Sequence, residues 1–392
     1  MSVDSAPTVE SVDSARTTEA DAAVFADRLF GAALGAMEVQ AVYLGDRLGW
    51  YRALAAHGPL TSTELAERTG CAERYAREWL EHQAVAGYLS VEDPAEAPAE
   101  APTEAAVARR YHLPAAHAEV LTDVDSLVYL APLARFIVGA GRHVDALREA
   151  YRTGGGVSWA ALGEDLREAQ GAMNRPLFLH QLGQEYLPQI PGLAQRLGRA
   201  GARVADVGCG VGWSAIAIAR AYPGVTVDGF DLDPPSVEAA RRNAAEAGVA
   251  DRVHFAVADI GQVQAGQAQA GQAQAGRRYD AVFAFECLHD MPDPVGVLTA
   301  MRGLAGPDGI VIVMDERTED RFTAPGSEVE RLLYGYSLIC CLPDGMSQQP
   351  SAATGTVMRA DTLIGYATRA GFSRVETLPL NHDFFRFYQL HS

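Results

Sequence analysis

At 392 residues, the chain is long enough for two domains of ordinary size. Its formal net charge of −18 excludes an extended surface for nucleic acid or anionic membrane, because both need clustered basic side chains. The five cysteines are odd in number and form no C-x-x-C pair, so a zinc site is not expected and we predict no bound metal. The first residues lack the basic and apolar pattern of a signal peptide, and no apolar run reaches spanning length. A cytoplasmic protein is therefore predicted.

The N-terminal region predicts a tail and then a helical domain. Residues 1–20 are mostly Ser, Thr, Ala and acidic residues, a composition typical of a disordered tail. From Asp21 to Leu54, apolar side chains recur at helical spacing. We assign residues 21–120 to one domain, because the helices and strands predicted after this helical stretch form a single layout.

Those elements indicate a winged helix. Thr61 or Ser62 can cap a helix that starts at Glu64 and ends at Gly70. A second helix follows and ends at Gly87, and the strand YLSV comes next. A returning strand is expected at 111–113. Helix, turn, helix and strand in this order is a winged-helix layout.

Two low-complexity segments interrupt the pattern. Residues 93–106 lie where the wing hairpin should turn, and residues 261–276 repeat a Gly-Gln-Ala unit. Neither segment has the side chains to build a core, so both are predicted to be flexible surface insertions.

The C-terminal half predicts a doubly wound α/β fold. We assign residues 121–195 to a helical linker and lid, and residues 196–392 to a catalytic domain. In the catalytic domain, five short β-rich runs alternate with helical ones, which indicates a parallel sheet with helices on both faces. The runs SRVETLPL and FFRFYQL are close enough to form an antiparallel hairpin. The total is a seven-stranded Rossmann-like sheet.

A glycine-rich turn follows the first of these strands. It reads Asp206-Val-Gly208-Cys-Gly210-Val-Gly212, and glycine lets a backbone turn sharply and approach a ligand closely. The dinucleotide fingerprint G-x-G-x-x-G fails because Trp213 occupies its last position. The pattern D-x-G-x-G-x-G resembles motif I of class I methyltransferases. The resemblance implies S-adenosyl-L-methionine as cofactor, with these four residues in its site.

The next two strand ends carry carboxylates. Asp231 ends the second strand, where an acid can accept hydrogen bonds from ribose hydroxyls in folds of this topology. The resemblance implies that Leu232 packs on the adenine and that Asp259 meets its amino group. Ile260 and Glu286 complete the predicted cofactor-binding residues.

The segment after the fourth strand carries the candidate for catalysis. His289 begins a sequence that resembles the H-D-x-x-D motif of plant and actinobacterial small-molecule O-methyltransferases, in which the His is the general base. An imidazole suits this role because a phenol with a pKa near 10 is mostly protonated at neutral pH. Asp315, at the end of the fifth strand, or Asp290 would orient the ring. The alternative is that His289 is a loop residue beside the cofactor.

Two further segments are candidates for covering the site. One spans residues 317–358 and contains Tyr334, Tyr336, Cys340, Cys341 and Met346, and the other runs from Met173 to Leu187. Apolar and aromatic side chains at such places cover a substrate, form a dimer contact or pack in the core.

The C-terminal sequence adds to the resemblance to methyltransferases. His382 and Asp383 open the sequence HDFFRFY, which is similar to that of actinobacterial winged-helix methyltransferases. The function expected is methyl transfer to a hydroxyl of a small aromatic or natural-product molecule by a homodimer. Methylation of nitrogen or carbon, or a non-methylating reaction, remains an alternative. A DNA-binding regulator is the alternative of another class, although its recognition helix alternates Arg with Glu.

Overall fold

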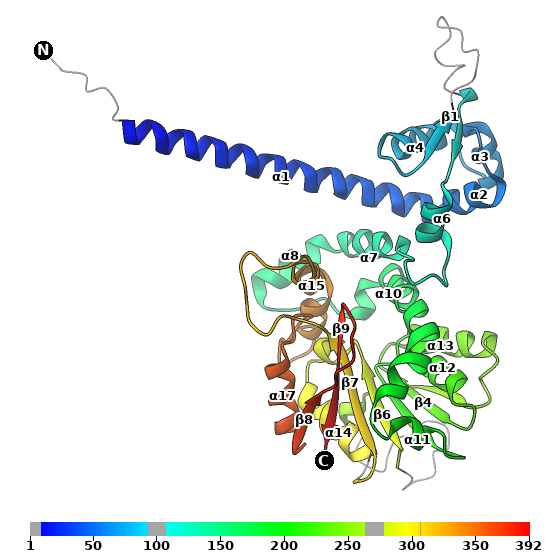
Figure 1. The fold of residues 1–392 in the computed structure, drawn as a ribbon, viewed down its shortest axis with the longest axis vertical. Helices are drawn as coiled ribbons and strands as arrows, with labels where there is room; N and C mark the ends of the chain where they lie inside the picture. Colours follow the sequence, from blue (N-terminus) through cyan, green and yellow to red (C-terminus); the bar gives the residue numbers. More distant parts are fainter. Residues whose placement is uncertain (1–8, 93–106, 263–277, 306) are drawn as a thin grey trace, which may run out of the picture. The chain divides into compact units, whose positions relative to one another are not determined.

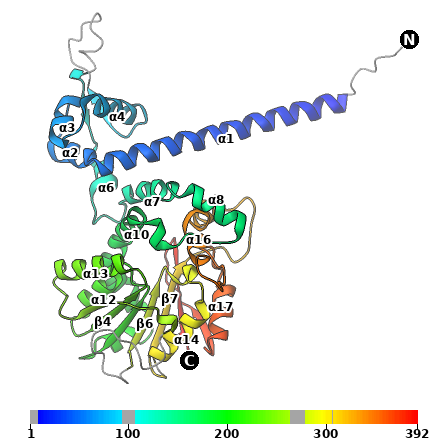
Figure 2. The ribbon, with the colours of Figure 1, turned by 180° about the vertical axis from the view of Figure 1, so that it is seen from behind.

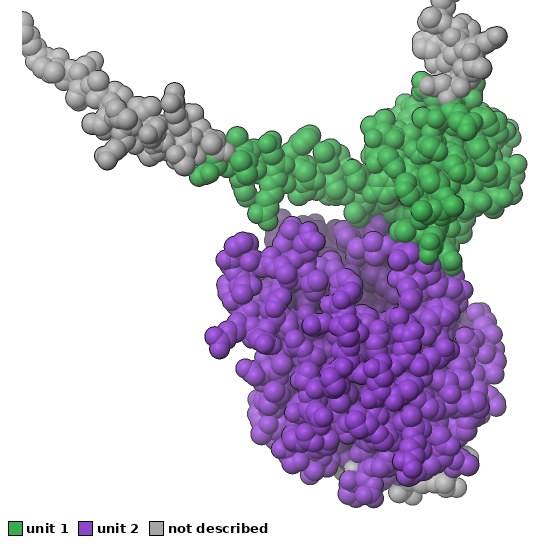
Figure 3. Space-filling view, viewed as in Figure 1, with its two compact units in different colours: residues 1–123 green, residues 124–392 purple. Residues whose placement is uncertain are grey.

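The computed structural model describes residues 9–92, 107–262, 278–305 and 307–392, and it divides into two compact units at Asp123 (Figure 3). The predicted insertions at 93–106 and 261–276 therefore lie outside the described residues, apart from residues 261 and 262. No described helix has both the length and the apolar character of a membrane span.

The first unit is a helical domain with a small hairpin (Figure 1). Its elements are α1 (Val9–Arg47), α2 (Trp50–His57), α3 (Ser62–Thr69), α4 (Glu73–Val85), β1 (Ser90–Glu92), β2 (Arg110–His112) and α6 (Ala115–Thr122). Thr61 caps α3 through a capping box, in which its hydroxyl accepts from Glu64 N at 3.2 Å and Glu64 Oε2 accepts from Thr61 N at 2.8 Å. β1 pairs antiparallel with β2, so the winged-helix layout is present.

The N-terminal helix differs from the prediction in two ways. It begins at Val9, so residues 9–20, which we expected to be disordered, are helical, and residues 1–8 lie outside the described residues. Ala and Glu are good helix formers and allow the helix to extend into this stretch. The helix ends at Arg47, and Gly49, with φ of 72°, separates it from α2.

The second unit begins with helices that precede the sheet. They are α7 (Ala131–Gly141), α8 (Val144–Thr153), α9 (Trp159–Leu162), α10 (Glu164–Leu177), the π-helix η1 (Phe178–Tyr186), the 3₁₀ turn η2 (Leu187–Gln189) and α11 (Leu193–Leu197). The sheet of this unit has seven strands in the order β5-β4-β3-β6-β7-β9-β8. The strands are β3 (Arg203–Val207), β4 (Thr226–Asp231), β5 (Val253–Val257), β6 (Ala281–Phe285), β7 (Ile310–Glu316), β8 (Arg374–Thr377) and β9 (Phe385–His391).

Pairing within this sheet is as the sequence predicted. The five strands β3 to β7 are parallel neighbours, and β9 pairs antiparallel with both β7 and β8. The remaining elements are α12 (Trp213–Ala221), α13 (Pro234–Glu246), η3 (Ile260–Gln262), η4 (Leu288–Asp290), α14 (Pro294–Ala305), α15 (Glu328–Tyr336), the π-helix η5 (Ser337–Cys341), α16 (Leu342–Gly345) and α17 (Ala360–Arg369).

Helices lie on both faces of this sheet (Figure 2), and alternating side chains of the strands form a buried core on each face. Val204, Phe283 and Ile312 pack with α12, α13 and η1, whereas their neighbours Ala205 and Val282 pack with α14 and α17. Because both faces are covered, most side chains of the parallel strands β3, β4, β6 and β7 are buried. The strands thus end together at one edge, where loops can gather side chains from several elements.

Candidate active site

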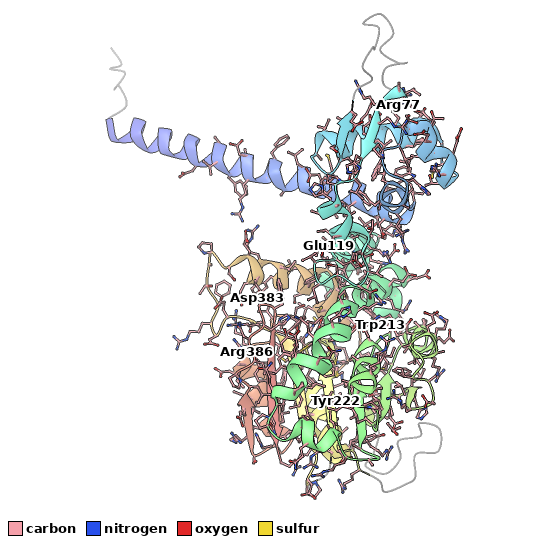
Figure 4. The ribbon with its side chains drawn as sticks, turned by 45° about the vertical axis from the view of Figure 1, so that its right-hand side comes forward. Arg77, Glu119, Trp213, Tyr222, Asp383 and Arg386 are labelled. Atoms are coloured by element: carbon pink, nitrogen blue, oxygen red, sulfur yellow. The ribbon has the colours of Figure 1, made fainter. Side chains whose placement is uncertain are left out.

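A cavity of about 1530 Å³ lies within the second unit, at the carboxyl ends of the parallel strands. Most predicted site residues line it: Gly208, Gly210, Gly212, Asp231, Leu232, Asp259, Ile260, Glu286, His289 and Asp290. Asp206 and Asp315 do not line it and are buried, each with 1% of its surface exposed. Trp213 and Asp383 also line the cavity, while Tyr222, beyond the far end of α12, lies away from it (Figure 4).

The glycine-rich loop is held by backbone hydrogen bonds to the neighbouring strand. Gly208 N donates to Phe230 O at 2.8 Å, and Gly210 N donates to Asp231 Oδ2 at 2.8 Å. Gly210 has φ of 51°, and a Cβ built on it would meet nothing within 4 Å. The loop therefore presents bare backbone to open space, which is what a ligand needs for close approach.

The two aspartates near this loop differ in what they face. Asp231 Oδ1 accepts from Asp233 N at 2.9 Å, and burial raises the pKa of Asp231. Asp206 accepts from the Ser214 hydroxyl at 2.5 Å, and burial raises its pKa to about 7. Asp231 lines the cavity, whereas Asp206 fixes the loop to the start of α12.

A salt bridge beside Asp231 was not predicted from the sequence. Arg167 on α10 reaches Asp233 with Nε at 2.5 Å and Nη2 at 3.3 Å, and Asp233 also caps α13 through Ser236 N. Burial would raise the pKa of Asp233, but the bond from Arg167 outweighs it and holds that pKa low. An acid just before a helix with Pro at its first position signals a cap, but nothing local points to an arginine 66 residues earlier.

The residues present fit S-adenosylmethionine. Gly210 leaves space for a ligand, and each Asp231 oxygen retains a lone pair to accept from ribose hydroxyls. Glu286 Oε1 is buried without a hydrogen-bond partner among the described residues, and it can accept from an ammonium group. Leu232, 53% exposed, provides an apolar surface, while the Ile260 side chain is buried in the core. Asp259 Oδ1 accepts from Gly261 N at 2.9 Å.

His289 stands at the centre of a cluster of acidic side chains. Its ring is 2% exposed, and Nδ1 lies 2.8 Å from Asp315 Oδ1 and 3.0 Å from Glu316 Oε2. On the other side of the ring, Nε2 lies 3.3 Å from Asp290 Oδ1. Asp290 is the more exposed partner, with 31% of its side chain accessible, and it lines the cavity together with His289. Both predicted orienting acids therefore contact the ring.

The charges of this cluster are coupled. Burial lowers the pKa of His289, but the charges of Asp290, Glu316 and Asp315 outweigh it and raise that pKa well above the ordinary value. Burial would raise the pKa of Asp315, yet the charge and hydrogen bond of His289 hold it low. Burial and the charge of Asp315 raise the pKa of Glu316 far above its usual range. Within this pair, negative charge is thus favoured on Asp315 and a proton is favoured on Glu316.

Glu286 has a backbone conformation that often occurs at functional positions. Its φ is 52°, a left-handed conformation that non-glycine residues rarely adopt. Its Oε2 accepts from Gln170 Nε2 at 3.5 Å, and burial followed by the charge of Asp315 raises its pKa to about 8. The sequence pointed to Glu286 but not to Gln170, which comes from a helix 116 residues earlier.

Both predicted covering segments contribute to the cavity wall. Met173 comes from α10, and Tyr336, Cys340 and Cys341 come from α15 and η5. Tyr336 packs edge-on against Phe136, with ring centroids 5.0 Å apart. Tyr334 and Met346, named in the same prediction, do not line the cavity. His382 and Asp383 line it from the loop before β9.

Two family models match the chain. Residues 32–123 match the Rv2258c-like winged HTH domain, and residues 199–348 match the methyltransferase domain. Two curated relatives are ubiquinone biosynthesis O-methyltransferases. The one from Paracidovorax citrulli is 38% identical over 133 residues, 34% of this chain and 50% of that protein. The one from Actinobacillus pleuropneumoniae serotype 5b is 34% identical over 115 residues, 29% of this chain and 45% of that protein. The chain thus spans about half the length of these relatives.

Solved structures match over nearly the whole chain. Mitomycin 7-O-methyltransferase MmcR has a TM-score of 0.66 at 22% identity, covering 95% of this chain and 99% of that one. Human N-acetylserotonin methyltransferase with SAM has a TM-score of 0.66 at 18% identity, covering 94% and 97%. NcsB1, solved with S-adenosylmethionine and 2-hydroxy-5-methyl naphthoic acid, has a TM-score of 0.58 at 19% identity, covering 91% and 96%.

These findings confirm the resemblance and the fold predicted from the sequence. The winged-helix elements α2 to α6 lie within the residues matched by the winged HTH model, and the five parallel strands β3 to β7 lie within those matched by the methyltransferase model, whereas β8 and β9 lie beyond them. The chain joins an N-terminal winged helix-turn-helix domain to a methyltransferase domain, with the fold of the class I S-adenosylmethionine-dependent methyltransferases.

Proposed function

We propose that this protein transfers a methyl group from S-adenosylmethionine to a hydroxyl of a small, largely aromatic molecule of the natural-product type. The observation that carries the proposal is the His289–Asp315 pair, which stands next to the same cavity that the Gly210 loop and Asp231 open into. The O-methyltransferase names of the relatives and structural neighbours support this choice of acceptor atom.

For this methyl transfer, the protein needs to supply only a base for the hydroxyl proton and the alignment of the reacting groups. S-adenosylmethionine supplies a methyl group on a positively charged sulfur, and the remaining thioether leaves as a neutral group without acid assistance. His289 Nδ1–H donates to Asp315, which leaves Nε2 as the proton acceptor for the substrate hydroxyl. The Asp315 carboxylate stabilises the imidazolium that forms, as an orienting acid does in other hydroxyl-activating sites.

The cavity wall supports an aromatic acceptor. Met173, Tyr336 and Phe285 line the same cavity as His289 and contribute apolar side chains to its wall. A site of this kind, apolar with a few polar groups that converge, is typical for small-molecule ligands. Segments α10 and α15 each end in a π-helix, a feature often found at functional sites.

The test has two stages on the purified protein. Calorimetry should detect binding of S-adenosylmethionine, and a screen of phenols and naphthols with labelled methyl donor should yield methyl ethers identified by mass spectrometry and NMR. Methylation only at nitrogen or carbon, or binding without transfer to any acceptor, would contradict the assignment of a hydroxyl.

We further propose that the protein is a homodimer joined through α1. Phe30, Leu34, Met37 and Leu44 follow each other at intervals of four, three and seven residues, and each is at least 45% exposed. Such a stripe buries itself against a second copy of the same helix. Sedimentation should show a dimer for the wild type and a monomer for Leu34→Glu with Met37→Glu. Gln40→Glu, an exposed polar position on the same helix, should remain dimeric.

The winged helix is proposed to serve this assembly rather than DNA. On α4, the recognition-helix position, Arg74 pairs with Glu78 at 2.5 Å and Arg77 pairs with Glu73 at 3.4 Å. Paired arginines of this kind leave little positive field for phosphate groups. Absence of a mobility shift with duplex DNA at low salt is the expected result, and a shift would overturn it.

A further inference from the structure

His382 is a residue that the sequence singled out and that the proposed reaction does not use. It lies in the loop before β9, is half-buried, and lines the same cavity as His289. Among the described residues, these two are the histidines of the cavity wall. Different groups hold the two rings, and this difference determines what each ring can offer to an acceptor molecule.

The His382 ring is held at Nδ1 by the backbone of its own loop. The N–H groups of Phe384 and Phe385 both donate to this nitrogen, each at 3.1 Å. A ring nitrogen that accepts hydrogen bonds carries no proton, so the proton of the neutral imidazole is on Nε2. The hydrogen bonds of this side chain to described residues both involve Nδ1, so the Nε2–H group is left to donate to a ligand.

A proton cannot be added to this ring without loss of those contacts. Protonation of Nδ1 would turn it from an acceptor into a donor and would place its N–H against two backbone N–H groups. Burial also lowers the pKa of His382, although the charge of Asp383 opposes this effect. His382 is therefore a hydrogen-bond donor and not a second base. In His289, by contrast, Nδ1 faces Asp315 and Nε2 is left to accept a proton.

Packing also fixes the position of the His382 ring. Tyr186 packs edge-on against it with ring centroids 5.5 Å apart, and the Phe385 ring centroid lies 4.8 Å away. Arg317, directly after β7, donates from Nη1 to the backbone O of His382 at 2.8 Å and so anchors the loop. A donor held in this way loses little conformational freedom when a ligand binds, so its hydrogen bond selects for geometry.

The two histidines approach the cavity from either side of β7. In the sheet, β7 lies between β6 and β9, and His289 follows β6 whereas the His382 loop precedes β9. Glu316 at the end of β7 pairs with Phe385 of β9, and its Oε2 lies 3.0 Å from His289 Nδ1. Neighbouring strands lie about 4.8 Å apart, so β6 and β9 are separated by about 10 Å. Fused aromatic rings with an oxygen at each end can span this width.

We propose that His382 determines acceptor specificity by donating a hydrogen bond from Nε2–H to a carbonyl oxygen of the acceptor. This carbonyl lies at the end of the molecule away from the hydroxyl that is methylated. The inference rests on the proposed function and adds a substrate class to it, the hydroxylated polycyclic aromatic ketones. A carbonyl oxygen suits a ring edge that only donates, because it has two lone pairs and no hydrogen of its own. A hydroxyl in the same place would leave its O–H without an acceptor on His382.

A matched pair of naphthols tests the inference on the full chain. One carries an acetyl group on the ring that lacks the hydroxyl, and the other carries an ethyl group at the same carbon. With labelled S-adenosylmethionine, we expect KM to be about fivefold lower for the ketone, since a hydrogen bond between neutral groups contributes a factor of this order. The difference should be in KM, because this contact is remote from the reacting atoms and is the same in the ground state and the transition state. Equal KM values would overturn the inference and leave the proposed O-methylation intact.

Three variants locate the preference. His382→Asn retains a side-chain oxygen that can accept from Phe384 N and Phe385 N but lacks the donor at Nε2, so the ratio of the two KM values should fall to about one. His382→Gln can place an amide N–H near the position of Nε2 and should keep part of the preference. Asp383→Asn is the matched control, because Asp383 is exposed and lines the cavity from the same loop. Retention of the preference in His382→Asn, or its loss in Asp383→Asn, would contradict the role given to His382.

Binding without turnover separates this inference from the proposed function. Calorimetry on the wild-type complex with S-adenosylhomocysteine should show that the ketone binds more tightly than its ethyl counterpart. If the ketone binds more tightly and neither compound is methylated, the role of His382 stands and the proposed function fails. If the two compounds bind equally, the inference fails whether or not they are methylated.

Discussion

The two ends of the cavity are built on different principles. The glycine-rich loop follows β3 and Asp231 ends the neighbouring strand β4, and N–H groups of the loop join the two by donating to Phe230 O and to the Asp231 carboxylate. The His289 cluster is assembled from side chains of β6, η4, β7, η5 and α16 or the residues beside them, and charge joins them. The glycine-rich end depends on the backbone conformation of the loop. The His289 end depends on which of its neighbouring groups carry a proton.

This difference decides how each end should respond to change. Loss of one group in the loop removes space or a hydrogen bond and leaves the rest in place. In the cluster, removal of one carboxylate shifts the pKa of every neighbour, since the groups interact over short distances in a buried environment. Mutational effects should therefore be separable in the loop and non-additive in the cluster.

The largest effect should come from the cluster. His289→Ala should lower kcat by between about a hundredfold and ten-thousandfold, with cofactor affinity almost unchanged, because a general base contributes a factor of this size. In the wild type the rate should rise with pH through the raised pKa of His289, since only the neutral ring accepts a proton, and then level off. A pH profile of the variant that matched wild type, or a loss confined to cofactor binding, would support the loop-residue alternative.

The next effect should be confined to the glycine end. Asp231→Ala should weaken S-adenosylmethionine binding by about 2–4 kcal/mol, because hydrogen bonds to a charged group are lost. Gly210→Val should prevent binding, since its side chain would occupy the open space in front of the loop. Calorimetry gives both affinities, and wild-type binding by either variant would contradict the position of the cofactor site.

A neighbouring glycine should affect stability instead. Gly212 has φ of 86°, and a Cβ there would lie 2.6 Å from Phe255 Cζ and 2.9 Å from Ala240 Cβ. Gly212→Ala should cost about 2 kcal/mol in the free energy of unfolding, through backbone strain and overpacking. Thermal unfolding compared with Gly210→Ala, whose Cβ meets nothing within 4 Å, isolates the packing contribution. Equal melting temperatures would mean that the loop can move away from Phe255.

The smallest expected effect distinguishes the roles of Asp315 and Glu316, the two acids that lie near His289 Nδ1. Asp315→Asn removes the ionised partner, so the pKa of His289 should fall, the pH profile should level off at lower pH, and kcat should drop roughly tenfold. Glu316→Gln should shift the profile less, because burial and the charge of Asp315 raise the pKa of Glu316 and so disfavour its charged form. Asp290, Glu286 and Cys341 also lie near this ring and remain in both variants. Equal shifts would show that the two acids share the charge.

Much of the fold could be read from the sequence because its signals are local. Apolar runs alternating with helical periodicity predict the parallel strands, and the short connection before β9 predicts the antiparallel pair. Composition misled at residues 9–20, where it indicated disorder and the structure has helix. In that stretch, the helix propensity of the residues favours a helix whereas their overall composition favours disorder, so neither signal alone determines the structure.

The sequence by itself determined the glycine loop, the acid after each strand and the position of His289, because a parallel sheet brings all strand ends to one edge. Only the tertiary structure decided what those groups meet. It brought Arg167 to Asp233, Glu316 to the same ring nitrogen as Asp315, and Asp344 to the side of Asp290. The physical reason is that charges interact through space and burial, and neither distance nor burial between remote segments is written in local spacing.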